Sequence, residues 1–374
     1  MEIQTPVVIL LFFIILFFIY HIYYTYKPQY EGFTSLRGGF LEGFQGNLKM
    51  KKKNKLTNIE KTDRDLNELP KYGYKEDVPL DEKKKEPNNS IVHGAKNVNY
   101  EKESITDTIE KKLDNSDFIF NKGNDIWTKF YCSIYDSLML DNTKNNYELK
   151  EIVRNTKMDK KSHILDIGCG TGHHVNMLTK KGLDAIGIDS SIEMIKRAKK
   201  NFPKCKFYNS DVMHGNQFGN GEFTHCMMLF MTPYYIQDKK AAFHNVYSWL
   251  KPNGYMIIHL VNRDKFDPRI EASDPLYKVN PQRFAKERIT KSFVKFNDFQ
   301  YKGEFVENGD SSKYVETMKQ DNGNKAIRNE HNYHMESQKE IIQKARDVGF
   351  KLKGKINMSP CQYPYEYLYV FEKV

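Results

Sequence analysis

A glycine-rich turn between a short apolar strand and a helix constrains the fold of this chain more than any other feature of its 374 residues. The strand is predicted over 163–168, and the turn reads Asp-Ile-Gly-Cys-Gly-Thr-Gly from Asp166 to Gly172. Glycines let the backbone turn sharply and let a ligand approach closely, because they carry no Cβ atom. The turn therefore predicts a ligand site beyond the carboxyl end of a strand in an α/β sheet.

Strands and helices alternate regularly after this turn. The further predicted strands are 184–191, 205–212, 223–230 and 255–263. Amphipathic segments between them predict helices, and two more helices are expected at 126–140 and 146–156, before the turn. Two further strands near the end of the chain, around 354–360 and 365–373, are expected to close the sheet as an antiparallel pair. This pattern is typical of a Rossmann-like, doubly wound and mostly parallel sheet with helices on both faces.

Residues 264–335 interrupt the alternation before a last predicted helix at 337–350. Polar and apolar residues alternate in this segment, with turn signals between short runs, which predicts an antiparallel meander of three or four strands. We expect this meander to form a small β cap inserted into an α/β domain that spans 116–374.

The N-terminal region predicts a membrane anchor. A tail at 1–6 precedes the apolar run at 7–26, which as a helix spans roughly 30 Å, the hydrocarbon thickness of a bilayer. The alternative is a cleaved signal peptide, but the run is long and no small-residue cleavage site follows it. Lysines and arginines follow the run, and only Glu2 precedes it, so the positive-inside rule places the bulk of the chain in the cytosol.

Residues 27–115 are charged, nearly balanced in sign and poor in apolar runs, so we expect a disordered tether. Most of the net charge of +10 therefore belongs to 116–374. Five cysteines without a CxxC pair show no disulfide framework or zinc ribbon, which suits a reducing compartment. The composition, rich in Lys, Asn and Tyr, is typical of AT-rich genomes, among them those of large DNA viruses, so a virion membrane is one candidate location.

Two other glycine loops do not fit the turn. A phosphate-binding P-loop requires Gly-Lys-Ser/Thr, but His173 and His174 follow Gly172. A dinucleotide-binding fingerprint counted from Gly168 requires its last glycine at position 173. Asp189, at the end of the next strand, is well placed to accept hydrogen bonds from a ribose diol.

Taken together, these segments resemble the class I S-adenosylmethionine-dependent methyltransferases. Residues 165–172 (LDIGCGTG) are similar to the first motif of that family, and Asp189, Ser210-Asp211-Val212 and residues 249–258 (WLKPNGYMII) resemble its later motifs in order. Asn253 stands where the family usually has glycine. The resemblance covers roughly residues 125–374 and implies S-adenosylmethionine as the cofactor, without defining the methyl acceptor.

The resemblance also implies roles for the matching residues. It places around the cofactor Tyr131, Asp166, Gly168, Gly170, Gly172, Asp189, Ser190, Met194, Asp211, Val212 and Met228. Asp166 would lie near the methionine amino group, Asp189 would bind the ribose hydroxyls and Asp211 the adenine amino group. Met228, with the residue after it, would offer main-chain contacts. Tyr131 resembles an aromatic residue that closes over the cofactor, although its position fits an ordinary helix core equally well.

The candidate catalytic residues, Tyr234, His259 and Asn262, lie near the ends of the fourth and fifth strands. An amine acceptor must reach the methyl group deprotonated, and a hydroxyl acceptor requires a general base. His259 also fits a buried core histidine, because its strand is apolar. His331 and His334 lack the cysteine or carboxylate partners of a metal site, so no metal is expected.

We therefore expect a membrane-anchored methyltransferase that faces the cytosol and acts on a small molecule, with an amine as the first candidate. A small cap at this position resembles small-molecule enzymes such as the glycine-type N-methyltransferases. Net positive charge keeps an RNA or RNA-cap substrate as an alternative partner, and the anchor keeps a lipid. A catalytically silent scaffold that retains the fold is the alternative outside enzymes.

Overall fold

The computed structural model describes residues 71–72, 117–273 and 281–374. The predicted tail at 1–6, the membrane segment at 7–26 and the tether at 27–115 lie outside the described residues, apart from 71–72. Within the part of the chain that is described, no helix is both long and apolar enough to cross a bilayer. The rest of this section concerns the unit from Thr62 to Val374.

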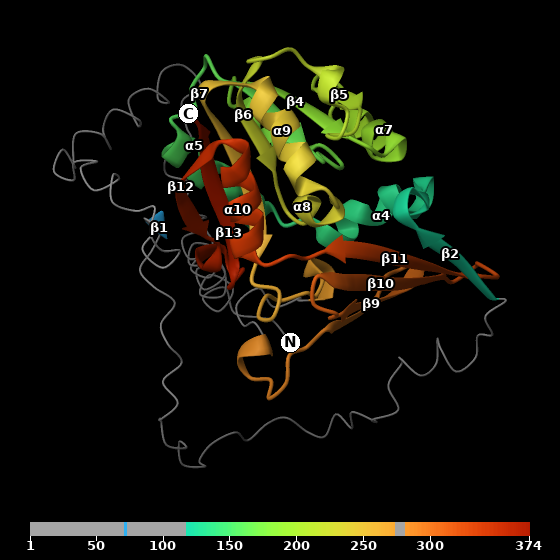
Figure 1. The fold of residues 1–374 in the computed structure, drawn as a ribbon. Helices are drawn as coiled ribbons and strands as arrows, with labels where there is room; N and C mark the ends of the chain where they lie inside the picture. The colour runs from blue at the N-terminus through green and yellow to red at the C-terminus, as the bar shows by residue number, and fades with distance from the viewer. Residues whose placement is uncertain (1–70, 73–116, 274–280) are drawn as a thin grey trace, which may run out of the picture. The chain divides into compact units, whose positions relative to one another are not determined.

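A mixed sheet of eight strands forms the centre of this unit (Figure 1). In spatial order its strands are β1 (Lys71–Tyr72), β12 (Phe350–Asn357), β13 (Glu366–Lys373), β7 (Leu250–Val261), β6 (Phe223–Met228), β3 (His163–Ile167), β4 (Asp184–Asp189) and β5 (Lys206–Asn209). The five strands from β7 to β5 are parallel, whereas β13 runs antiparallel to both β7 and β12. The predicted α/β class and the antiparallel closing pair are confirmed.

Helices cover both faces of this sheet. The helices outside the cap are α4 (Lys129–Met139), α5 (Asn142–Thr156), α6 (His173–Lys180), α7 (Ile192–Asn201), α8 (Thr232–Tyr235), α9 (Lys239–Trp249) and α10 (Gln338–Val348). One apolar cluster contains side chains of α9 and α10, and a second contains side chains of α5, α6 and α7. The parallel strands carry apolar side chains on both sides, as their sequences predict, so each face of the sheet has its own buried cluster.

Polar side chains determine where several helices begin. Ser191 accepts a hydrogen bond from the backbone N–H of Met194 at the start of α7, and Asp238 accepts one from Ala241 at the start of α9. Such caps satisfy N–H groups that the first turn of a helix leaves free. The loop that leads from β4 into α7 therefore has a defined shape, with Asp189 and Ser190 just before the cap.

The cap is a second sheet of five strands. Its order is β2 (Phe118–Lys122), β11 (Ala326–His334), β10 (Ser311–Gln320), β9 (Phe299–Val306) and β8 (Lys291–Lys295). The strands from β8 to β11 form the predicted antiparallel meander. The strand β2, which the sequence did not predict, pairs in parallel with β11 and joins residues far apart in the chain. Helices α4 and α8 lie between the two sheets (Figure 1).

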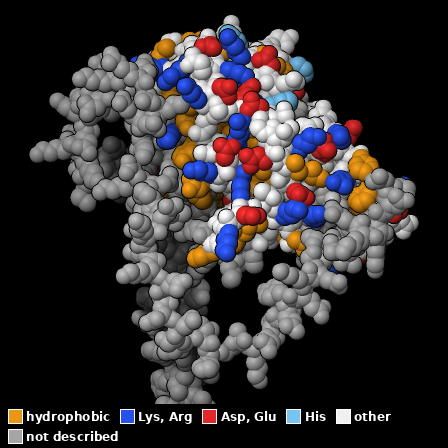
Figure 2. Space-filling model, turned by 60° about the horizontal axis from the view of Figure 1, so that its bottom comes forward, with side chains coloured by type: hydrophobic (Ala, Val, Ile, Leu, Met, Phe, Trp, Pro, Cys, Tyr) orange, Lys and Arg blue, Asp and Glu red, His pale blue; other side chains and the backbone are white. Residues whose placement is uncertain are grey.

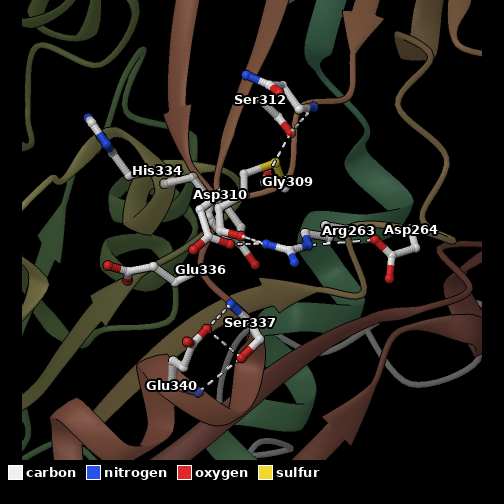
Figure 3. Close-up of polar contacts among 12 residues, drawn as sticks. Arg263, Asp264, Gly309, Asp310, Ser312, His334, Glu336, Ser337 and Glu340 are labelled. Carbon is white, nitrogen blue, oxygen red and sulfur yellow. Dashed lines mark hydrogen bonds and ion pairs between the residues drawn. The ribbon is translucent and has the colours of Figure 1, made fainter.

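An arginine joins the end of β7 to the cap (Figure 3). Arg263 donates hydrogen bonds to Asp310, in the turn before β10, and to the carbonyl oxygen of Met335 at 2.8 Å. Just beyond, Ser337 and Glu340 form a capping box that begins α10. These contacts define the path of the chain from the cap back into the main sheet.

Candidate active site

A pocket of about 680 Å³ lies between the carboxyl ends of the parallel strands and the cap sheet. Its lining comes from the loops that follow β3, β4, β5 and β6, from α4 and α8, and from β10 and β11. Ligands of open α/β sheets bind at this edge, where neighbouring loops diverge. The two parts of the lining differ in chemistry. We name the part around the glycine turn, Asp166 and Asp189 the cofactor lobe, and the part formed by aromatic side chains the aromatic lobe.

The glycine turn forms the floor of the cofactor lobe. Gly168 and Gly170 line the pocket with φ angles of 70° and 52°. A Cβ atom on Gly168 would lie 2.6 Å from the side chain of Thr232, so no larger residue fits there. A Cβ atom on Gly170 would meet nothing within 4 Å, which leaves open space beside the backbone. Gly172 does not line the pocket: its space is taken by Phe207.

Asp189 lies at the end of β4 and faces this turn. Its carboxylate accepts one hydrogen bond from the backbone N–H of Gly170 and one from that of Ser191, both at 2.9 Å. Burial raises the pKa of Asp189 to about 6 despite these two hydrogen bonds. A carboxylate has about four lone-pair positions, so two acceptor positions remain for ligand hydroxyls.

Asp166 is buried at the end of β3 and lines the same lobe. Its Oδ2 atom has no hydrogen-bond partner in the structure. The pKa of Asp166 is raised to about 7, mainly by burial and also by the nearby carboxylates of Glu148 and Asp189, against the lowering effect of His174. An unpaired carboxylate oxygen in a buried position is stabilised by a cationic ligand group.

The structure brings most of the predicted cofactor residues together and leaves two out. Those that line the pocket are Tyr131, Asp166, Gly168, Gly170, Asp189, Ser190, Met194, Asp211 and Val212. Met228 is a fully buried residue at the end of β6, and the lining begins at the next residue, Leu229. Gly172 caps α6 instead.

Lys144 is a lining residue that the sequence analysis missed. It is buried on α5, with its ammonium 3.9 Å from the ring centre of Phe230. Lys144 and Asp166 both lie close enough to His174 to affect its pKa. Among the described residues, Lys144 is the only lysine or arginine in the lining, which also contains five aspartates. A carboxylate and an ammonium, both buried, together suit a zwitterionic group such as the amino acid part of S-adenosylmethionine. The sequence alone gave no sign of this role, because Lys144 lies in a polar run, 142–146, at the start of α5.

The aromatic lobe faces the cofactor lobe from the cap side. It consists of Trp127, Tyr131, Tyr135, Tyr235, Tyr314, His331 and Tyr333. The ring centres of Trp127 lie 5.7 Å from Tyr131, 5.8 Å from Tyr235 and 5.8 Å from His331, so the rings form one connected group. Ring faces attract cations, most strongly where water is excluded.

The predicted catalytic residues do not reach the pocket. The hydroxyl of Tyr234 accepts a hydrogen bond from the backbone N–H of Val261 at 2.8 Å and fixes α8 against β7. His259 is fully buried, with Nδ1 2.6 Å from the carbonyl oxygen of Phe230 and Nε2 3.0 Å from Glu366. The Asn262 side chain accepts from the backbone of Asp264. All three have structural contacts instead, and Tyr235 is the neighbour that lines the pocket.

No group of three or more histidine, cysteine, aspartate or glutamate side chains suited to a metal ion occurs among the described residues. On the face shown in Figure 2, lysine and arginine side chains are interspersed with aspartate and glutamate. The pocket itself has five aspartates against one lysine, although the chain carries a net charge of +10. The excess positive charge therefore lies outside the pocket, and the pocket suits cationic ligands.

Comparison with known proteins gives a family match over most of this unit. The sequence model of the methyltransferase-domain family matches residues 142–353. A dTDP-3-amino-3,4,6-trideoxy-alpha-D-glucopyranose N,N-dimethyltransferase of Streptomyces venezuelae is 25% identical over 135 residues, which are 34% of this chain and 56% of that protein. A trans-aconitate 2-methyltransferase of Enterobacter sp. (strain 638) is 28% identical over 112 residues, which are 29% of this chain and 43% of that protein. The chain thus spans about half the length of these curated relatives.

Solved structures share the fold. An S-adenosylmethionine-dependent methyltransferase from Clostridium acetobutylicum ATCC 824 superposes with a TM-score of 0.50 at 19% identity, covering 65% of this chain and 97% of that one. The CcbJ methyltransferase from Streptomyces caelestis gives a TM-score of 0.50 at 11% identity, covering 65% and 96%. At such identities the likeness concerns the fold alone.

Proposed function

The chain belongs to the methyltransferase-domain family, and we propose that it transfers a methyl group from S-adenosylmethionine to an amine on a small molecule. The observation that carries this proposal is a single pocket in which a cofactor lobe meets an aromatic lobe, with five aspartates in the lining. Curated relatives that act on an amino sugar and on trans-aconitate support a small acceptor. The aromatic rings and the acidic lining favour an amine over a carboxylate.

The residues of the cofactor lobe fit the donor. The unpaired oxygen of Asp166 suits its ammonium group, Lys144 its carboxylate and Asp189 its ribose hydroxyls. The open space beside Gly170 leaves room for the ligand against the backbone. When bound, S-adenosylmethionine supplies an electrophilic methyl group on a positively charged sulfur. The chain's own residues then orient the acceptor, exclude water and remove its proton.

A labelled-methyl assay on the full-length chain tests the reaction. The chain should methylate at least one amine in a panel containing ethanolamine, an aminohexose, an alcohol, a carboxylate, a phospholipid vesicle and a capped RNA. Gly170→Arg should abolish the label, because its long side chain would enter the open space beside the backbone that the ligand needs. Label found only in the alcohol, the carboxylate, the lipid or the RNA would make that compound the acceptor and overturn the proposal of an amine. No label in any compound, with a folded chain, would support a catalytically silent scaffold.

The raised pKa of Asp166 predicts that binding of S-adenosylmethionine releases protons. With its pKa at about 7, Asp166 is about half protonated at pH 7, and an adjacent ammonium group lowers that pKa. Binding of S-adenosylmethionine at pH 7 should therefore release about half a proton from this residue, and affinity should fall as the pH drops below 7. Calorimetry in phosphate and in Tris, which differ in ionisation enthalpy, measures the release. The same heat in both buffers would contradict the assignment, and Asp166→Asn should show less release than wild type.

We further propose that residues 7–26 anchor the chain in a membrane, with 116–374 on the cytosolic side. The proposal rests on the apolar run and on the basic residues after it. Full-length chain should sediment with membranes after a carbonate wash, and a chain without 1–26 should not. Equal distribution of the two chains would overturn the anchor without affecting the enzyme proposal.

A further inference from the structure

A row of hydrogen bonds runs from the pocket surface into the cap sheet. The hydroxyl oxygen of Tyr235 lies 2.7 Å from Nδ1 of His331, and Nε2 of His331 lies 2.8 Å from Oε2 of Glu316. Exposure falls along the row, from 38% for Tyr235 to 2% for His331 and 0% for Glu316. Tyr235 and His331 both line the pocket, and Tyr235 is the more exposed of the two, so it is the member of the row most accessible to a molecule in the pocket.

The surroundings of Glu316 determine the direction of these bonds. Burial raises the pKa of Glu316, but His331 and the hydroxyls of Tyr301 and Tyr131 lower it by more, so the pKa lies below its usual range. Glu316 is therefore a carboxylate at neutral pH, and Nε2 of His331 carries the proton donated to it. In a neutral ring Nδ1 is then the acceptor for the hydroxyl of Tyr235.

We propose that Tyr235, His331 and Glu316 form a relay that removes a proton from the ammonium group of the amine acceptor. The inference rests on the proposed function. An N–H bond of the ammonium breaks and the proton joins the oxygen of Tyr235, while the hydroxyl proton of Tyr235 moves to Nδ1 of His331. The nitrogen keeps the electron pair that methyl transfer requires. His331 gains one positive charge, which the carboxylate of Glu316 stabilises.

The other groups around His331 do not compete for this proton. The titratable side chains that face it are Tyr131 from α4, Tyr235 from α8, Tyr314 and Glu316 from β10, and Tyr333 from β11. Burial raises the pKa of each of these tyrosines, so all four stay neutral at physiological pH. Glu316 is the charged group among them.

Two variants test the relay with the amine that gives most label in the panel above. Tyr235→Phe removes one hydroxyl and should lower kcat/KM about 100-fold at pH 7, within the usual range for general base catalysis. The loss should shrink as the pH approaches the pKa of the free amine, because the acceptor then arrives deprotonated. Glu316→Gln should show the same pH pattern. A loss of equal size at every pH would indicate a purely structural role and overturn the relay.

A measurement without methyl transfer gives an independent readout. In full-length chain with ¹⁵N-labelled histidine and no cofactor, adding the amine at pH 7 should shift the Nδ1 signal of His331, because the amine then bonds to the Tyr235 hydroxyl that donates to Nδ1. The signal is assigned by its loss in His331→Gln. Tyr235→Phe should bind S-adenosylmethionine normally but show no such shift. An unchanged His331 signal in wild type saturated with the amine would overturn the relay.

Tyr369→Phe is the matched control. Tyr369 is a buried tyrosine on β13 whose hydroxyl donates to Gln338 at 2.9 Å, outside the pocket lining. Its pH profile should match wild type. If wild type methylates an amine while Tyr235→Phe and Glu316→Gln keep its pH profile, the relay alone is wrong. If wild type methylates no amine, the proposed function is wrong, and the relay with it.

Discussion

Asp189→Ala should weaken binding of S-adenosylmethionine by about 100-fold or more. A hydrogen bond to a charged group contributes about 1.5–3 kcal/mol, and the two ribose hydroxyls would lose two such bonds. The substitution also removes the acceptor for the N–H groups of Gly170 and Ser191, so the glycine turn loses part of its support. Calorimetric titration of the full-length chain measures the affinity, and a thermal melt measures the loss of stability.

The same strand offers the control for this experiment. Asp184 begins β4, and its half-exposed side chain forms an ion pair with Lys206 at the surface. Asp184→Ala should leave the affinity unchanged, because β4 separates this carboxylate from the pocket. Asp189→Asn keeps one carbonyl acceptor and should bind with intermediate affinity. Wild-type affinity in Asp189→Ala would show that the donor lies elsewhere.

The main sheet could be predicted because its signals are local. Each of these signals occupies about ten residues of sequence or fewer: the apolar run of β3, the turn after it and the capping residues of the following helices. Parallel strands buried on both faces also need continuous apolar residues, which the sequence shows directly. The order of the helices and strands therefore predicted the edge of the sheet at which the pocket lies.

Pairings between distant segments could not be predicted in the same way. Strand β2 pairs with β11 across more than two hundred residues. Its apolar residues Ile119 and Phe120 are exposed, so no alternation of buried and exposed positions marks β2 as a strand. Backbone hydrogen bonds to β11 hold it in the sheet. The position of Trp127 in the aromatic lobe depends on this pairing, because η4 (Gly123–Ile126) follows β2 directly.

The neighbours Tyr234 and Tyr235 show where sequence reasoning about the site ended. The two residues are neighbours in a helix of four residues, and successive side chains on a helix point about 100° apart. One therefore bonds to β7 and the other faces the pocket. Similarly, His331 reads as an isolated histidine in sequence, and only the alignment of β10 with β11 places Glu316 beside it.

Gly172→Ala should destabilise the fold by about 2–5 kcal/mol, although the residue does not line the pocket. A Cβ atom there would lie 2.5 Å from the ring of Phe207 and 3.1 Å from Ala198, both in the packed core between β5 and α7. Overpacking of this kind costs about 1–3 kcal/mol, and the left-handed conformation, with φ at 90°, costs an alanine about 1–2 kcal/mol more. Urea unfolding of the full-length chain, followed by circular dichroism, measures the change.

Two companion variants separate the steric contribution from the conformational one. Gly170→Ala adds the same methyl group where nothing lies within 4 Å, so it should cost only the conformational part. Phe207→Leu replaces the clashing ring with a smaller side chain. The double variant with Gly172→Ala should therefore lose less unfolding free energy than the sum of the losses in the two single variants. Full additivity would show that the ring does not restrict position 172. The expected coupling would mean that the third glycine of the turn is required by the packing of α6 and β5, while the first two form the floor of the pocket.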